Sequence, residues 1–165
     1  MKELMVVVAV LVLAGCAAQK KIQLVERIPF PENEYVQLQK TGTASVKGQA
    51  FLKTRGGDVK VAAGEEIILN PVTSYSTQWY EQAYLTQKML SPADSRQEQY
   101  IIKTIGDGSG RFVFKNVPAG EYYLTARVVW ESPTGYQGAM ELQGGYFSKR
   151  IKVADREEME IILTR

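Results

Sequence analysis

The clearest pattern of apolar and polar positions lies between residues 111 and 130. Phe112 and Phe114 alternate with charged or smaller residues, and a second alternating run follows a few positions later. The apolar side of the second run consists of Tyr122, Leu124, Ala126, Val128 and Trp130. A period of two residues predicts β-strands, because successive side chains of a strand point to opposite faces. Pro118 separates the runs and lacks the N–H that a strand ladder needs, so we expect two strands joined by a corner over residues 116–120.

Asp107-Gly108-Ser109-Gly110 precedes the first of these strands. Glycine accepts positive φ without steric cost, and aspartate bonds readily to nearby backbone, so this run predicts a tight hairpin turn. Calcium is the alternative reading of the same residues. A calcium ion takes about 6–8 oxygen ligands, whereas this turn offers one carboxylate and a hydroxyl. We therefore expect a turn here and no metal site.

Further short strands are expected on both sides of this region. Their ranges are Ala44–Thr54, Glu65–Pro71, Tyr100–Ile105, Phe147–Val153 and Met159–Leu163. Residues 59–64 read as a short strand or a loop, and the glycines and proline of residues 131–145 predict a loop. About seven short strands at this spacing predict an all-β fold, an antiparallel β-sandwich formed by residues 44–165 as one domain.

Residues 74–90 differ in character from the strands. They contain helix-forming residues without glycine or proline, which predicts a short helical insert near residues 76–89. Four aromatic residues gather there: Tyr75, Trp79, Tyr80 and Tyr84. They are candidate binding residues, because aromatic rings can stack on sugars or anchor a protein partner. The alternative is that they only pin the insert to the sandwich. A second candidate contact surface is the loop between Trp130 and Tyr146, with Tyr136 and Met140.

The first residues predict a secretion signal. Leu4–Leu13 is an unbroken apolar run, about half the length that a membrane-spanning helix needs, and it follows Lys2. Leu13-Ala14-Gly15-Cys16 then resembles the lipobox of bacterial lipoproteins. That resemblance implies a signal peptide over residues 1–15 and a diacylglycerol on the Cys16 thiol. The alternative is an ordinary secretory signal with a chance cysteine.

Residues 16–43 are expected to carry the lipidated cysteine and a tether. Pro29 and Pro31 exclude a helix across the middle of this segment, and an extended stretch is expected to pack Ile28, Phe30 and Tyr35 against the domain. Lipid-anchored domains need such a spacer. Ala17 after the cysteine resembles outer-membrane cargo, which implies the periplasmic face of the outer membrane if the host is Gram-negative.

Composition narrows the possible chemistry. The chain has 165 residues with a net charge of +2, so nucleic acid is not expected as a partner. It contains no histidine and one cysteine, which removes the commonest general base and any Cys-based zinc site. The pairs Glu65-Glu66 and Glu157-Glu158 face opposite ways on a strand and cannot act as a glycosidase dyad. We expect no cofactor and no enzymatic activity.

Four segments together resemble the carboxypeptidase regulatory-like domain, a transthyretin-like β-sandwich. They are GQAFL, IILNP, DGSGRFVFKNVPAGEYYL and the terminal IKV…EMEIILT, and the resemblance covers residues 44–164 apart from the insert. Members of this family are mostly non-catalytic modules. Its hydroxyisourate hydrolase branch uses histidines, which this chain lacks, so that activity does not carry over.

Together these features predict a membrane-anchored bacterial envelope lipoprotein that acts as a non-catalytic protein-interaction or structural module. The alternative is a carbohydrate- or peptidoglycan-binding module that uses the aromatic cluster of the insert. A hydrolase of undetermined kind is the second alternative. The expected partners are the membrane, through lipidated Cys16, and an envelope protein or a glycan.

Overall fold

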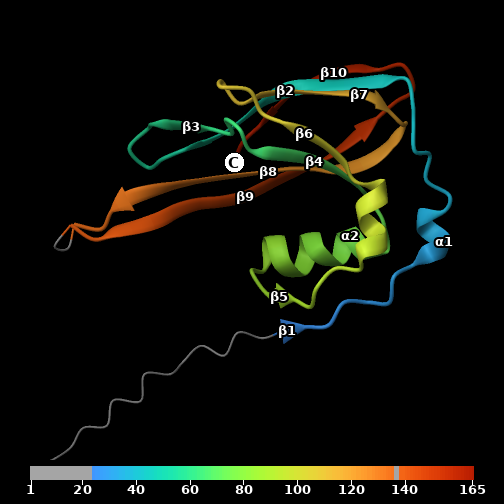
Figure 1. The fold of residues 1–165 in the computed structure, drawn as a ribbon, viewed down its shortest axis with the longest axis horizontal. Helices are drawn as coiled ribbons and strands as arrows, with labels where there is room; N and C mark the ends of the chain where they lie inside the picture. The colour runs from blue at the N-terminus through green and yellow to red at the C-terminus, as the bar shows by residue number, and fades with distance from the viewer. Residues whose placement is uncertain (1–23, 136–137) are drawn as a thin grey trace, which may run out of the picture.

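The structure, a computed structural model, describes residues 24–135 and 138–165. The predicted signal peptide, Cys16 and Tyr136 lie outside the described residues. Two β-sheets pack face to face, and a helical insert lies on the outer side of one of them (Figure 1). The predicted all-β sandwich with a short helical insert is confirmed.

The first sheet has the strand order β10-β2-β7, and β3 also pairs with β2. Its strands are β2 (Ala44–Lys53), β3 (Val59–Val61), β7 (Arg111–Val117) and β10 (Glu158–Leu163). The second sheet has the order β6-β4-β8-β9. Its strands are β4 (Glu66–Pro71), β6 (Ile102–Ile105), β8 (Gly120–Pro133) and β9 (Met140–Val153). Neighbouring strands run antiparallel in both sheets except β10 and β2, which are parallel.

The core lies between the two sheets, on the faces that alternation predicts. Phe112 and Phe114 of β7 are both buried and meet edge to face, with ring centroids 5.7 Å apart. Leu124 and Ala126 of β8 face them from the second sheet, and Trp130 is half-buried against the same core. Burial of these side chains is the main favourable contribution to folding.

The turn over residues 107–110 forms as expected, but it does not close a hairpin. It carries the chain from β6 in the second sheet to β7 in the first, so the strands that it joins are not paired. The Asp107 carboxylate accepts hydrogen bonds from the backbone N–H groups of Arg111 and Ser109, at 2.9 and 2.8 Å. These bonds lower the pKa of Asp107, because they stabilise its charged form. Gly110, at φ 71°, approaches the first sheet too closely to carry a Cβ atom.

The loop predicted over residues 131–145 is wrong. β8 continues to Pro133 and pairs with β9 from Met140 onward, so most of this range belongs to a long two-stranded ribbon. Figure 1 shows the ribbon extending well beyond the other strands. Gly144 and Gly145 lie inside β9 with φ of 95° and 131°. Glycine inside a strand commonly marks an irregular bend or a close approach, not its end.

The insert begins and ends earlier than expected. It consists of the α-helix α2 (Ser74–Gln78), the π-helix η1 (Trp79–Leu85), β5 (Met89–Leu90) and the 3₁₀-helix η2 (Ser95–Tyr100). Helical structure therefore covers residues 74–85 and not 76–89. Its early start is set by Thr73, whose side chain caps the first turn. The strand expected from Tyr100 begins at Ile102, after η2.

Much of the segment predicted as a tether is folded onto the insert. β1 (Leu24–Val25) pairs with β5 in parallel, and α1 (Glu32–Tyr35) follows it. Tyr35 is wholly buried, as expected, and its ring lies 4.5 Å from that of Phe30 in a stacked arrangement. Residues ahead of β2 in the described part of the chain therefore pack against the insert.

Candidate functional site

The start of the insert is fixed by a hydrogen-bonded cap. The side chain of Thr73 accepts from the backbone N–H of Ser76, and the Ser76 side chain accepts from the backbone N–H of Thr73. The Ser76 hydroxyl also donates to the Pro71 carbonyl oxygen at 2.7 Å, and the Thr73 hydroxyl donates to Tyr35 at 3.1 Å. Because all these groups are satisfied in a buried setting, α2 has a defined position on the second sheet.

Tyr75 has a packing role. Its side chain is 2% exposed, and its hydroxyl accepts a hydrogen bond from the backbone N–H of Asp94 at 2.8 Å. The ring of Phe30 meets it edge to face, and the Arg27 guanidinium lies 5.2 Å from its ring centroid. Every side of Tyr75 is thus occupied by the protein itself, so Tyr75 is not placed to contact a ligand.

Tyr80 joins the insert to the sheet below it. Its ring stacks on that of Tyr123 in β8, with centroids 4.5 Å apart and an interplanar angle of 16°. The Tyr123 hydroxyl makes a 3.1 Å hydrogen bond with Thr77 of α2. Burial raises the pKa of Tyr80, because a phenolate there would lose hydration. The predicted cluster is therefore divided, and Tyr75 and Tyr80 belong to its packing half.

Trp79 and Tyr84 form the other half, and the π-helix explains why they meet. Their rings are nearly parallel, at 20°, with centroids 6.0 Å apart. In a π-helix hydrogen bonds run from residue i to residue i+5, so residues five positions apart lie on the same face. In an α-helix the facing positions are three or four apart, and this pair would diverge. The Tyr84 hydroxyl accepts from the backbone N–H of Ser148 in β9 at 3.1 Å, which fixes the pair against the second sheet.

A surface hollow of about 290 Å³ opens beside this pair. Its lining residues come from the insert, β9 and the end of the described chain: Trp79, Ala83, Tyr84, Gln87, Gly144, Gly145, Tyr146 and Arg165. Tyr146 is 56% exposed, and the Arg127 guanidinium lies 5.8 Å from its ring centroid. The indole N–H of Trp79 has no hydrogen-bond partner among the residues that the structure describes, and it is not sealed from solvent. The hollow thus combines aromatic faces with free polar groups.

A larger open groove of about 770 Å³ adjoins the hollow, because Gly144 and Arg165 line both. It lies between the β2–β3 hairpin and the β8–β9 ribbon. Its charged lining residues are Lys53, Arg55, Asp58, Lys60, Glu131 and Arg165. Gly144 packs closely against β8, and a Cβ atom there would lie 2.2 Å from the Val128 carbonyl oxygen and 2.7 Å from the Trp130 ring.

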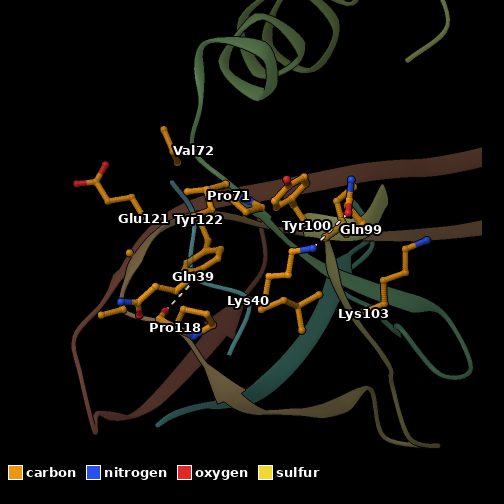
Figure 2. Close-up of a pocket in the computed structure, with 15 residues that line it drawn as sticks. Gln39, Lys40, Pro71, Val72, Gln99, Tyr100, Lys103, Pro118, Glu121 and Tyr122 are labelled. Atoms are coloured by element: carbon orange, nitrogen blue, oxygen red, sulfur yellow. Dashed lines mark hydrogen bonds between the residues drawn. The ribbon is translucent and has the colours of Figure 1, made fainter. Parts of the chain in front are cut away.

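Another pocket, of about 320 Å³, lies between residues 38–40, η2 and the start of β8 (Figure 2). The Lys40 amine donates to the Gln99 side chain at 3.2 Å and lies 5.2 Å from the Tyr100 ring centroid. Glu121 and Lys103 lie on opposite sides of the pocket in this view (Figure 2). Each is already engaged outside it, because Glu121 pairs with Arg150 and Lys103 with two glutamates.

These ion pairs shift the pKa values of both groups. The bond with Arg150 lowers the pKa of Glu121, and the bond with Glu98 raises the pKa of Lys103. Both shifts favour the charged form, so the two residues remain ionised and paired at neutral pH. Glu121 and Lys103 are therefore not available to a ligand in this pocket, and the Lys40 amine is held by Gln99 and the Tyr100 ring. The aromatic hollow has the stronger combination of ring faces and polar groups, and we favour it as the candidate site.

The aromatic signal in the sequence located part of this site. Trp79 and Tyr84 line the hollow, Tyr80 supports it from beneath, and Tyr75 lies elsewhere in the core of the insert. Tyr146 falls at the limit of the second contact surface suggested by the sequence, and Arg165 carried no sequence signal. Met140, in the same predicted surface, is 53% exposed near the end of the ribbon.

The described residues include no helix with the length and apolar character needed to cross a membrane. No protein-family model matches the chain, and no curated protein matches it. Among solved structures, the chain is similar to a proposed carbohydrate-binding protein from Pseudomonas aeruginosa. The two superpose with a TM-score of 0.75 at 26% sequence identity, over 84% of this chain and 99% of the other.

Proposed function

We propose that this protein is a carbohydrate-binding module, held at the bacterial cell envelope by a lipid on Cys16. The observation that carries the proposal is the parallel pair of Trp79 and Tyr84 at the edge of the 290 Å³ hollow. Flat aromatic faces suit the apolar faces of sugar rings, and a few polar groups at the rim suit their hydroxyls. Gln87 and Arg165 line the hollow and supply such groups here, and the Gln87 amide nitrogen is held in place by the Tyr84 carbonyl oxygen at 2.7 Å.

Two further observations support sugar binding over a purely structural role. The platform is preformed, since Tyr84 is bonded to β9 and Tyr80 is stacked on Tyr123, so binding would cost little ordering of side chains. The similar Pseudomonas aeruginosa structure, described as a proposed carbohydrate-binding protein, adds support from outside the chain.

A binding panel tests the proposal directly. The full-length protein in detergent micelles is applied to immobilised polysaccharides, including peptidoglycan, and retention is compared with that of Trp79→Ala and Trp79→Phe. We expect the alanine variant to lose affinity by about tenfold or more, because the stacking surface is removed, and the phenylalanine variant to keep part of it. Urea unfolding checks that both variants fold. Equal retention of folded Trp79→Ala and the natural protein on every polysaccharide contradicts the proposal.

The lipid anchor needs its own test. Two or three acyl chains on Cys16 contribute about 0.8 kcal/mol per buried CH₂, which is sufficient for stable membrane attachment. Cells grown with an alkyne fatty acid should label the natural protein and not Cys16→Ser, and only the natural protein should sediment with membranes. An unlabelled protein in the soluble fraction would remove the anchor from the proposal without affecting the sugar site.

A protein-interaction role is the second candidate, favoured by the ribbon. Met140 and Leu142, 53% and 61% exposed, lie near its end, where apolar side chains gain little unless something covers them. Cross-linking in cells should recover an envelope protein with the natural chain, and the double variant Met140→Ser, Leu142→Ser should lose it. Retention on polysaccharide should be unchanged by that variant, which separates the two candidates. Release of sugar during the binding assay would point instead to the hydrolase alternative.

A further inference from the structure

Several basic side chains that form no ion pair among the described residues gather in the groove beside the aromatic hollow. Four basic side chains and two acidic ones line it: Lys53, Arg55, Lys60 and Arg165, with Asp58 and Glu131. None of the six forms an ion pair within residues 24–135 and 138–165. The lining side chains therefore carry a net charge of +2 at neutral pH, counted without the backbone carboxylate of Arg165.

Some basic residues elsewhere on the surface are paired with acidic ones. Arg150 pairs with Glu121, Lys103 lies 3.1 Å from Glu98, and Arg96 lies 2.8 Å from Asp94. These charges are satisfied within the protein. Other surface lysines and arginines are unpaired within the described part of the chain, like those of the groove, and the groove differs from them in bringing four basic side chains into one space. The arrangement keeps cationic groups available to an outside anion.

The groove and the aromatic hollow form one continuous surface. Arg165 and Gly144 line both spaces, so a chain molecule resting on Trp79 and Tyr84 would enter the groove if it extended past Gly144. The basic side chains Lys53 and Arg55 come from the β2–β3 hairpin on the opposite side, and both are exposed.

We infer that the carbohydrate bound by this protein is acidic, a polysaccharide whose sugars carry carboxylate or sulfate groups. The inference rests on the proposed function. One sugar ring stacks on Trp79 and Tyr84 while charged groups of neighbouring sugars lie among the basic residues of the groove. Arginine suits this role, because its guanidinium can bind a carboxylate or a sulfate with two parallel hydrogen bonds. Opposite charge also speeds the first encounter, in a salt-dependent way.

Matched pairs of polysaccharides test the charge directly. Polygalacturonate is compared with its methyl ester, and dextran sulfate with dextran, because each pair shares a backbone and differs in charge. The full-length protein in detergent micelles should bind the charged member of at least one pair about tenfold more tightly at low salt. Raising the salt concentration should reduce that preference. Whichever pair shows the difference identifies carboxylate or sulfate as the preferred group.

Two triple variants distinguish binding in the groove from nonspecific electrostatic attraction to the basic residues of the protein. The groove variant is Lys53→Ser, Arg55→Ser, Lys60→Ser, and the control is Lys115→Ser, Lys149→Ser, Lys152→Ser. Both remove three positive charges, and the control residues are exposed on β7 and β9 outside the two spaces. We expect the groove variant alone to lose the preference for the charged member and to keep the affinity for the neutral one.

The outcomes distinguish the inference from the function on which it rests. Equal binding of charged and neutral members, with loss on Trp79→Ala, overturns the acidic ligand and leaves sugar binding intact. A charge preference that both triple variants lose, or that neither loses, also overturns the inference. If no polysaccharide is bound in a Trp79-dependent way, the proposed function fails and the inference fails with it.

Discussion

The outer faces of the two sheets differ sharply in exposure. On the second sheet the outward residues Tyr123 and Thr125 are only 1% and 2% exposed, because the insert covers them. On the first sheet the outward residues Val113 and Ile162 are 50% and 60% exposed. Strand alternation is the same in both sheets. What differs is the presence of one added segment, and the candidate site lies at the edge of that segment.

The difference shows how an insert can add a candidate site to a sandwich without changing its core. The insert buries Tyr75 and stacks the half-buried Tyr80 on Tyr123 of β8. Its Trp79 and Tyr84, also half-buried, line the hollow beside β9. Side chains of one type therefore have two roles, which are set by the direction in which each one projects. The two sheets have the same strand architecture, and only the one covered by the insert has the candidate site beside it. The fold by itself therefore does not identify a function.

The largest effect should follow the loss of the contact between insert and sheet. Tyr123→Ala removes the stack with Tyr80 and the hydrogen bond to Thr77, and we expect a loss of about 3 kcal/mol in the free energy of unfolding. Urea unfolding measures it. Tyr123→Phe, which keeps the stack, should cost about 1 kcal/mol. On the uncovered sheet Val113→Ser should cost less than about 0.5 kcal/mol, and a comparable loss there would end the contrast between the two faces.

A smaller effect is expected at the rim of the covered face. Gly144→Ala forces a Cβ atom against the Val128 carbonyl and the Trp130 ring at positive φ, and should cost about 2 kcal/mol. Gly145→Ala is the matched control, because that position has positive φ but no atom within 4 Å of the added Cβ. The same urea series compares them. Equal losses at the two positions would show that backbone strain, and not the close approach at Gly144, decides the effect.

The smallest effect concerns acid stability. The hydrogen bond with Arg96 lowers the pKa of Asp94, beside the insert, from its usual value to about 2, and the pKa of Asp107 at the sheet-crossing turn is also lowered. A lowered carboxyl pKa stabilises the folded state above the unfolded pKa of about 4, and that contribution disappears as the pH falls through the folded pKa. Stability should therefore be flat above about pH 5 and decline between about pH 4 and pH 2.

Variants locate the source of this decline. Asp94→Asn and Asp107→Asn should each be less stable than the natural protein at pH 7, and each should show a shallower fall in stability on acidification. Thermal unfolding followed by circular dichroism across that pH range provides the measurement. A decline as steep as that of the natural protein in both variants would assign acid sensitivity to other carboxylates.

The core could be predicted from the sequence because its signal is local. Alternation in β7 and β8 placed Phe112, Phe114 and Leu124 inward, and all three are buried. The ribbon could not be predicted in this way. Each of its strands is exposed on both sides near the tip, so selection for an apolar face is absent and residues 131–145 show no alternation. Its glycines then resemble loop residues although two of them lie within β9.

The site was only partly predictable for a different reason. Trp79 and Tyr84 are close in the sequence, so their cluster was visible, but Tyr146 and Arg165 reach the hollow through the register of β9 and the position of β10. That proximity depends on the whole fold. The division between aromatics that attach the insert and aromatics that line the hollow depends on the π-helix, which no composition rule distinguishes from an α-helix of the same residues.

The wide turn of η1 makes the aromatic platform sensitive to residue count. Gln82 lies between Trp79 and Tyr84 in the sequence. Deleting it would reduce their spacing from five residues to four, which is the spacing of facing residues in an ordinary α-helix. Both rings would survive in the sequence, yet their orientation toward the hollow and the Tyr84 bond to β9 would change together. Deletion of one residue could therefore disrupt the candidate site while every aromatic residue is retained. Related chains are best compared by the length of this helix as well as by its residues.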